Sequence, residues 1–126
     1  MAKTRGFRGA TTADDNTKEA IVEATKEMLE ALVAANDIEV DDIASATFST
    51  TRDLNAEFPA VAARKHLGWN YVALMNSHEM DVPDAQPNCI RVMVLVNTDP
   101  GGLSADLHAV PTVHLGADDG RRLMSW

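Results

Sequence analysis

The most apolar run of the chain is Cys89-Ile90-Arg91-Val92-Met93-Val94-Leu95-Val96-Asn97-Thr98. It is rich in β-branched residues and too short to cross a membrane as a helix, which predicts a strand at the centre of a sheet, buried on both faces. Arg91 interrupts the apolar pattern. An arginine stays charged at ordinary pH, and taking it out of water costs several kcal/mol unless it is paired. Arg91 therefore points at a carboxylate of the protein or at an anion that the protein binds.

The composition indicates a single domain spanning residues 1–126, with 45% hydrophobic and 24% charged residues. This length supports one core but no separate ligand-binding lobe. The single cysteine, Cys89, excludes an internal disulfide and fits a reducing compartment. Lys3, Arg5 and Arg8 precede no long apolar segment of the kind that a signal peptide needs. We expect a cytoplasmic protein without a membrane span.

The net charge of -8 and the pI of about 4.8 argue against nucleic acid as a partner, because phosphate binding needs a basic face. Three Phe, two Trp and one Tyr also provide little surface for stacking bases. A few arginines are still sufficient for a local pocket that binds a small anion.

The residue pattern predicts strands that alternate with helices. The expected strands are Thr4–Ala10, Ala44–Thr50, Trp69–Met75, the central run, and an edge strand His108–Leu115. The expected helices are one capped by Asn16 or Thr17 that runs to about Ala35, and one from Phe58-Pro59 to Leu67 that stops at Gly68. Helical turns are expected at 40–43 and 103–107, and a loose polar tail at 116–126. The order predicts an α+β (α/β-like) fold, a mixed sheet of about five strands with helices on one face.

Apolar residues mark the faces that pack in the core. On the long helix they recur at helical spacing, as Ile21, Thr25, Met28, Leu29 and Leu32. On the strand that follows, Ala44, Ala46 and Phe48 alternate with Ser45, Thr47 and Ser49.

The first strand contains two glycines three residues apart, Gly6 and Gly9. This pattern alone is weak evidence for a phosphate loop, since no Gly-Lys-Ser/Thr follows. Close approach of another part of the protein to the backbone is the favoured explanation. Arg5 and Arg8 are also three apart, so a strand presents them on opposite faces.

The side chains that commonly bind metals or attack substrates show no motif. His66, His78, His108 and His114 lack the spacing of metal ligands, and Cys89 begins a buried strand, where a free cysteine behaves as a small hydrophobe. Spacing alone identifies no Ser-His-Asp triad. We expect no metal site.

Charged residues beside apolar strands are what remain: Arg8, Glu79 and Arg91. Two interpretations stay open on these residues. In one, Glu79 or Asp81 neutralises Arg91 as a buried ion pair. In the other, two arginines and a hydrogen-bonding carboxylate form an anion pocket.

Four segments carry a family resemblance. They are Arg5-Gly6-Phe7-Arg8-Gly9-Ala10-Thr11-Thr12, Asp53-Leu54-Asn55-Ala56-Glu57-Phe58-Pro59-Ala60 followed by Ala63-Arg64, Glu79-Met80-Asp81-Val82, and Ile90-Arg91-Val92. Together they resemble the monofunctional chorismate mutases of the AroH class, over a stretch from residue 5 to about Asp99. Four motifs in this order and at this spacing are a specific signal. The resemblance implies a homotrimer with a central pseudo-α/β barrel, interfacial active sites, and the rearrangement of chorismate to prephenate.

The resemblance also implies roles for residues of one subunit. Arg8 would bind a substrate carboxylate, and Arg91 would reach the ether oxygen and the other carboxylate. Glu79 would accept a hydrogen bond from the ring hydroxyl. Asn76 stands where the family often has a Cys or Ser that bonds the same hydroxyl.

The neighbouring subunit would supply Phe58, against the apolar face of the substrate, and Arg64, near the mouth of the site. Ala60, Met75 and Leu115 are further substrate-binding positions that the resemblance implies. The reaction is a one-step pericyclic rearrangement, which needs no nucleophile, proton transfer or cofactor. Catalysis then consists of holding a flexible dianion in a compact conformation and placing a fixed cation where negative charge develops.

Departures from the family pattern fall mainly near the C-terminus. Val61 replaces a frequent lysine, the family's late tyrosine has no counterpart, with Val110 falling closest, and Leu115-Gly116-Ala117-Asp118 replaces Leu-Arg-Pro-Asp. They keep a second hypothesis open: a catalytically weak trimeric dianion-binding protein that partners another shikimate-pathway enzyme. A trimeric imine deaminase of the RidA type has its own motifs, which are not found here.

Overall fold

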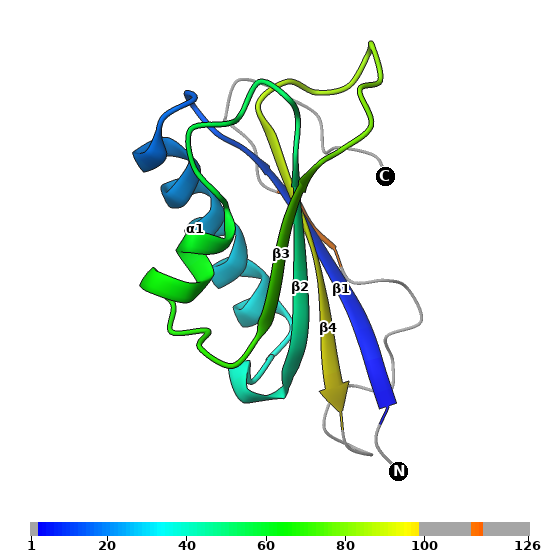
Figure 1. The fold of residues 1–126 in the computed structure, drawn as a ribbon. Helices are drawn as coiled ribbons and strands as arrows, with labels where there is room; N and C mark the ends of the chain where they lie inside the picture. Colours follow the sequence, from blue (N-terminus) through cyan, green and yellow to red (C-terminus); the bar gives the residue numbers. More distant parts are fainter. Residues whose placement is uncertain (1–2, 99–111, 115–126) are drawn as a thin grey trace.

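The computed structural model describes residues 3–98 and 112–114. A mixed β-sheet forms one layer, and helix α1 with a short helical segment covers one of its faces (Figure 1). The elements in chain order are β1 (Lys3–Thr12), α1 (Lys18–Ala35), the 3₁₀ turn η1 (Val40–Asp42), β2 (Ile43–Thr50), the π-helical turn η2 (Ala62–His66), β3 (Ala73–His78), β4 (Cys89–Thr98) and β5 (Thr112–His114). The α+β architecture with helices on one face is as predicted.

The strand order across the sheet is β3-β2-β4-β1-β5. β4 is the middle strand and runs antiparallel to both β1 and β2, whereas β2 pairs with β3 and β1 pairs with β5 in parallel. The predictions of a mixed five-stranded sheet, of the apolar run as its centre, and of an edge strand near the C-terminus are therefore confirmed.

Helix α1 begins and ends at residues that satisfy its terminal backbone groups. Thr17 is the N-cap, and its hydroxyl accepts from Ala20 N at 3.1 Å. At the other end, Asn36 Nδ2 donates to Leu32 O at 2.9 Å. The five residues predicted as its apolar face are its buried residues, and the helix packs against β1. This packing closes one face of the sheet.

The other face of the sheet is open in the single chain, and the prediction that β4 is buried on both faces is wrong. Val92, Val94 and Val96 lie in the core, while Met93 and Leu95 are 49% and 38% exposed. The cause is that the helices of the described residues lie on one side only, so alternate side chains of β4 have no second layer above them.

The third strand lies further along the chain than expected, at Ala73–His78 instead of Trp69–Met75. Gly68 adopts a φ of +71° after the short helix, and Trp69 N then donates back to Ala63 O at 3.0 Å. Trp69 is buried in the core as part of this turn. The backbone group that a strand would use for pairing is therefore occupied by the helix end.

The prediction that Ala44 faces the core is also wrong, because a bulge interrupts β2 at this position. Between Ile43 and Ser45 the pairing of β2 with β4 shifts by one residue. Ala44 is exposed, while Ala46 and Phe48 are buried as expected.

The short helix follows Pro59 as predicted, and its turn at Ala62–His66 is wider than an α-helix. The predicted turn 103–107, residues 108–111, Leu115 and the predicted tail 116–126 lie outside the described residues. None of the helices in residues 3–98 is both long and apolar enough to span a bilayer.

Candidate active site

Two rows of side chains cross the open face of the sheet. One row is Met75, Thr47, Met93 and Arg8, and the next is Ser77, Ser49, Arg91 and Ala10, in the order β3, β2, β4, β1. Residues paired across strands point to the same face, and diagonal neighbours stay within reach of long side chains. Arg8 and Arg91 are such diagonal neighbours. Two arginines therefore share the open face, as the anion-pocket interpretation requires.

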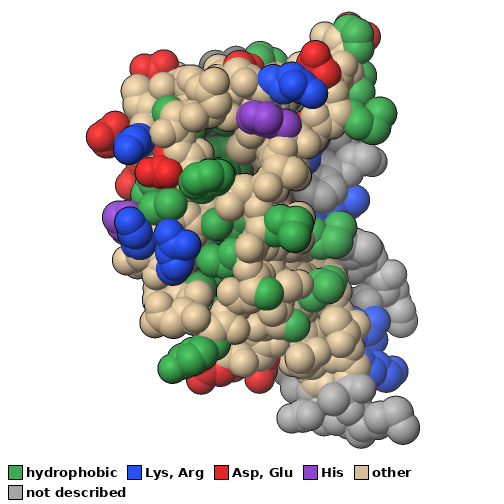
Figure 2. Space-filling view, viewed as in Figure 1, with side chains coloured by type: hydrophobic (Ala, Val, Ile, Leu, Met, Phe, Trp, Pro, Cys, Tyr) green, Lys and Arg blue, Asp and Glu red, His purple; other side chains and the backbone are tan. Residues whose placement is uncertain are grey.

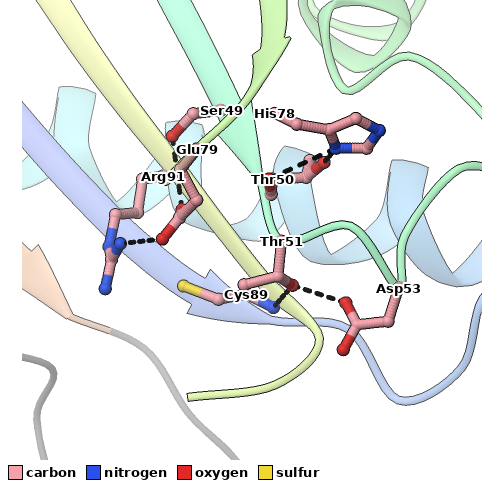
Figure 3. Close-up of polar contacts among 8 residues, drawn as sticks. All are labelled: Ser49, Thr50, Thr51, Asp53, His78, Glu79, Cys89 and Arg91. Atoms are coloured by element: carbon pink, nitrogen blue, oxygen red, sulfur yellow. Dashed lines mark hydrogen bonds and ion pairs between the residues drawn. The ribbon is translucent and has the colours of Figure 1, made fainter. Parts of the chain in front are cut away.

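The guanidinium of Arg91 is paired with a carboxylate. Its Nη1 donates to Glu79 Oε2, and the two side chains are only 20% and 13% exposed (Figure 3). The partner is Glu79, and Asp81, the other candidate, is exposed. Glu79 reaches this position because its backbone N–H donates to Thr50 O at 2.9 Å, just beyond the end of β3.

The second oxygen of the Glu79 carboxylate has a different partner. Ser49 Oγ donates to Glu79 Oε1 at 3.4 Å (Figure 3). Ser49 and Arg91 are directly paired across β2 and β4, so both approach Glu79 from neighbouring strands of one face. The serine was not identified from the sequence. Its place on the polar side of strand 44–50 is readable there, but its pairing with Arg91 depends on the strand order.

A cavity of about 450 Å³ opens beside Ser49 and Arg91. It is lined by Thr47, Ser49, Arg91, Val92 and Met93. Its size is in the range of small-molecule sites. The lining combines a cation, hydroxyl groups and an apolar thioether. The ion pair with Glu79 confirms the first interpretation of Arg91. Arg91 also lines this cavity, so the anion pocket stays open as the second interpretation.

Arg8 lies on β1 with its side chain partly buried, directly across from Met93. Its neighbour Phe7 is fully buried in the core on the other face. The alternation of the strand accordingly directs Arg8 to the open face. Arg5, by contrast, is exposed near the start of the strand.

Asn76 belongs to a second cluster, on the face of the sheet that the helices cover. It pairs in register with the core residue Phe48, and its Oδ1 accepts from Ala60 N at 3.0 Å. A cavity of about 320 Å³ lies here, with Phe58 and Asn76 in its wall. Phe58 itself is 64% exposed. The cluster thus joins an apolar ring, an amide and the first turn of the short helix.

The described part of the chain therefore divides the predicted site residues into two groups. Arg8, Glu79 and Arg91 lie on the open face with Met75, which is 65% exposed. Phe58, Ala60 and Asn76 are grouped at the second cavity, apart from the Arg91 pair. Leu115 lies outside the described residues.

Arg64 lies on the exposed side of the short helix. Arg64, Lys65 and His66 occupy its last turn, and basic and histidine side chains gather over this helix in Figure 2. All three residues are exposed. The helix therefore presents positive charge beside the second cluster.

Hydrogen bonds fix the loop that follows β2 against the start of β4. Asp53 Oδ1 accepts from Thr51 Oγ1 (Figure 3). Asp53 Oδ2 accepts from Asn88 N at 2.9 Å. Thr51 Oγ1 accepts in turn from Cys89 N at 2.9 Å. Asn88 has a φ of 53°, a conformation that asparagine tolerates better than most residues. This network sets the point from which β4 carries Arg91.

Asn16 holds the segment that leads to Phe58. Its Oδ1 accepts from the backbone N–H groups of Asn55 at 2.9 Å and Ala56 at 3.0 Å, and its Nδ2 donates to Asn55 Oδ1 at 2.9 Å. Because these bonds cross from the start of α1 to the loop, the position of Phe58 is coupled to the helix layer.

Cys89 is buried at the start of β4, and burial raises the pKa of its thiol to about 11, although the nearby Arg91 lowers it in part. A thiolate is therefore disfavoured, which agrees with the expected role of a small hydrophobe. Within residues 3–98 and 112–114, no three His, Cys, Asp or Glu side chains gather in a way that could hold a metal ion.

Comparison with known proteins gives one consistent family. The family model for chorismate mutase type I matches residues 4–109. "Chorismate mutase AroH" of Bacillus subtilis is 44% identical over 95 residues, which are 75% of this chain and 75% of the relative. "Chorismate mutase AroH" of Thermus thermophilus is 44% identical over 96 residues, covering 75% of this chain and 78% of the relative. The solved chorismate mutase from Clostridium thermocellum has 45% identity and a TM-score of 0.79, over 88% of this chain and 94% of the other.

Proposed function

Because this chain belongs to the chorismate mutase type I family, we propose that it is an isomerase that rearranges chorismate to prephenate, with Arg91 at the centre of its site. The observation that carries the proposal is that Arg91, which is paired with Glu79, lines a cavity on the open face of the sheet. The cavity offers a fixed cation beside a hydrogen-bond acceptor. A small dianion with a ring hydroxyl has the complementary groups.

Arg91 is proposed to act in the transition state. As the ether bond of chorismate breaks, negative charge builds on its oxygen, and a cation already in place stabilises that charge without reorganising. Arg91 suits this role because it stands on the central strand and is oriented by Glu79. Its planar fork also fits a carboxylate.

Arg8 and Glu79 are proposed to hold the substrate in its reactive conformation. Arg8 binds one carboxylate from the neighbouring strand, diagonal to Arg91. Each oxygen of an ionised carboxylate has two lone pairs, so Glu79 keeps acceptor capacity for the ring hydroxyl beside its bonds to Arg91 and Ser49. Restraint of a flexible dianion lowers the entropic part of the barrier, and this chemistry needs no cofactor.

We further propose that the protein is a cytoplasmic homotrimer whose sites lie between subunits. Met75, Met93 and Leu95 leave an apolar stripe exposed on the open face, which a second copy of the chain would cover. The division of the site residues into two clusters supports the same arrangement. Phe58 and Asn76 of one subunit would then complete the cavity over Arg91 of the next.

Subunit mixing tests the interfacial site. Arg91→Ala and Phe58→Asp each inactivate the enzyme alone, the second by placing a carboxylate against a dianion. If each site takes Arg91 from one subunit and Phe58 from the next, random mixing of equal amounts restores about a quarter of the sites, the product of two independent halves. Sites built within one chain would restore no activity.

Sedimentation of the wild type and of Leu95→Asp tests the assembly itself. We expect the wild type to sediment as a trimer and Leu95→Asp to dissociate.

The activity is tested by the loss of chorismate absorbance with purified protein. We expect turnover in the wild type, loss by a factor of at least about 100 in Arg91→Ala, and no change in Arg5→Ala, which removes an exposed arginine of β1. Saturable binding of chorismate without prephenate in the wild type would instead establish the dianion-binding protein. Near-normal turnover in Arg91→Ala would remove Arg91 from the reaction.

A further inference from the structure

We propose that Ser49 is a positioning residue, which orients the Glu79 carboxylate for the proposed reaction. The proposal rests on the proposed function of the site. It starts from the different partners of the two carboxylate oxygens: Oε2 accepts from Arg91 and Oε1 accepts from Ser49 at 3.4 Å. A carboxylate held at one oxygen still rotates about its terminal bond, which has a broad torsional minimum. A second donor from another strand limits that rotation.

The sheet fixes the geometry of this second donor. Ser49 and Arg91 are paired residues of β2 and β4, and β2 also pairs with β3, whose extension carries Glu79. The three side chains thus come from three adjacent strands and meet on one face (Figure 3). Strand pairing holds their separation, so Ser49 acts from a rigid support.

The length of the Ser49–Glu79 bond is consistent with this role. At 3.4 Å it is longer than the usual distance for O–H donors. Hydrogen bonds of active sites are often long in the free enzyme and shorten when substrate binds. Ser49 also lines the cavity beside Arg91, so a substrate bound in this cavity would lie next to the Ser49 side chain.

The role differs from simple packing in its kinetic consequence. With Ser49 removed, Glu79 keeps its bond to Arg91, and the arginines still bind the substrate carboxylates. The ground-state affinity is then largely kept, whereas the alignment of Glu79 with the ring hydroxyl is lost. We expect Ser49→Ala to lower kcat about tenfold and to change KM less than about threefold.

The experiment compares three variants in the chorismate assay. Ser49→Thr keeps the hydroxyl and is expected to return kcat to within about threefold of the wild type. Ser45→Ala removes a partly buried serine from the same strand and face, and is expected to leave both constants unchanged. Thermal unfolding of each variant identifies any that fail to fold, and Ser49→Thr keeps the test valid if Ser49→Ala is such a case.

A double-mutant cycle decides whether Ser49 acts through Glu79. In a Glu79→Ala background, adding Ser49→Ala is expected to lower kcat no further, because the residue that Ser49 orients is gone. A full additional loss would overturn the proposal, as would wild-type kinetics in Ser49→Ala. Absence of turnover in the wild type is a separate result: it refutes the proposed function, and the positioning role with it.

Discussion

Asn76 and Glu79 are close in the chain, yet their side chains lie on opposite faces of the sheet. Asn76 Oδ1 accepts from Ala60 N at 3.0 Å on the face that the helices cover, while Glu79 bonds to Arg91 and Ser49 on the open face. Positions separated by an odd number of residues on an extended strand alternate in this way. Within one chain, the Asn76 amide and the Glu79 carboxylate therefore do not face one another across a shared site.

The bond between Asn76 and Ala60 predicts a structural effect of mutation. Asn76→Ala removes the acceptor of a partly buried backbone N–H at the start of the short helix, and we expect it to lower the free energy of unfolding by about 1 kcal/mol. Asn76→Asp keeps an acceptor at the same place and is expected to lose less. Urea unfolding measures both.

Ser77→Ala is the control for this pair of variants, because Ser77 is exposed on the open side of the same strand. Its effect is expected to stay within about 0.5 kcal/mol. Equal stability of Asn76→Ala and the control would contradict the proposed support of the short helix.

Gly9 predicts a second effect on stability, through close packing of β1 on α1. A Cβ at Gly9 would lie 3.2 Å from Met28 Cγ and 3.4 Å from Val92 Cγ1, so a methyl group has to displace core side chains. We expect Gly9→Ala to cost about 1–3 kcal/mol of unfolding free energy. At Gly6 the nearest atom is Leu95 Cδ2 at 3.7 Å, an ordinary contact. Gly6→Ala is therefore the matched control, expected near the wild type in thermal unfolding.

These glycines illustrate how much of the fold the sequence predicts. Close approach at Gly9, a helix cap at Asn16 or Thr17, and the apolar face of α1 follow from local spacing, and the structure confirms them with Thr17 as the cap. The start of β3 was not predicted correctly, because Trp69 bonds back to the end of the short helix, a contact between residues that pattern analysis treats separately. Caps, close packing and apolar faces depend on neighbouring residues and can be predicted from the sequence. Whether the Trp69 N–H bonds to a strand or to the end of the short helix cannot.

In the site, too, the features that depend on one residue were predicted, and those that depend on strand order were not. The pairing of Arg91 with a carboxylate follows from the cost of burying a charge. Ser49 was missed because its partnership with Glu79 requires the order β3-β2-β4, which brings together strands from distant parts of the chain. The opposite faces of Asn76 and Glu79 likewise follow only once β3 is placed at Ala73–His78.

Cys89 predicts a dependence of stability on pH. Burial raises the pKa of its thiol from 9.0 to about 11, so the folded state favours the neutral form. The contribution of Cys89 to stability is therefore complete below the ordinary pKa and is lost as the pH rises through the folded-state value. Relative to Cys89→Ala, the wild type is expected to lose about 2 kcal/mol of unfolding free energy by about pH 11.

Denaturant unfolding of both proteins at about pH 8 and at higher pH measures this difference, since other titrating groups are common to the two. A constant difference across the range would contradict the raised pKa. Cys89→Ser is a less suitable comparison, because it places a hydroxyl group in the buried site.

The shape of the Arg91 side chain, and not only its charge, is expected to matter. Arg91→Lys keeps a positive charge on the central strand, but an ammonium group has no planar fork with which to bond Glu79 and a substrate carboxylate together. We expect kcat/KM to fall by at least about 100-fold, nearly as far as in Arg91→Ala, with the loss in kcat larger than the change in KM. Arg5→Lys, at an exposed position of β1, is the matched control and should retain wild-type kinetics. Circular dichroism and sedimentation are the controls that test whether the variants fold and assemble as the wild type does. Near-normal turnover in Arg91→Lys would mean that a point charge is sufficient for the reaction. The orientation of the Arg91 guanidinium by Glu79 would then have no role in catalysis.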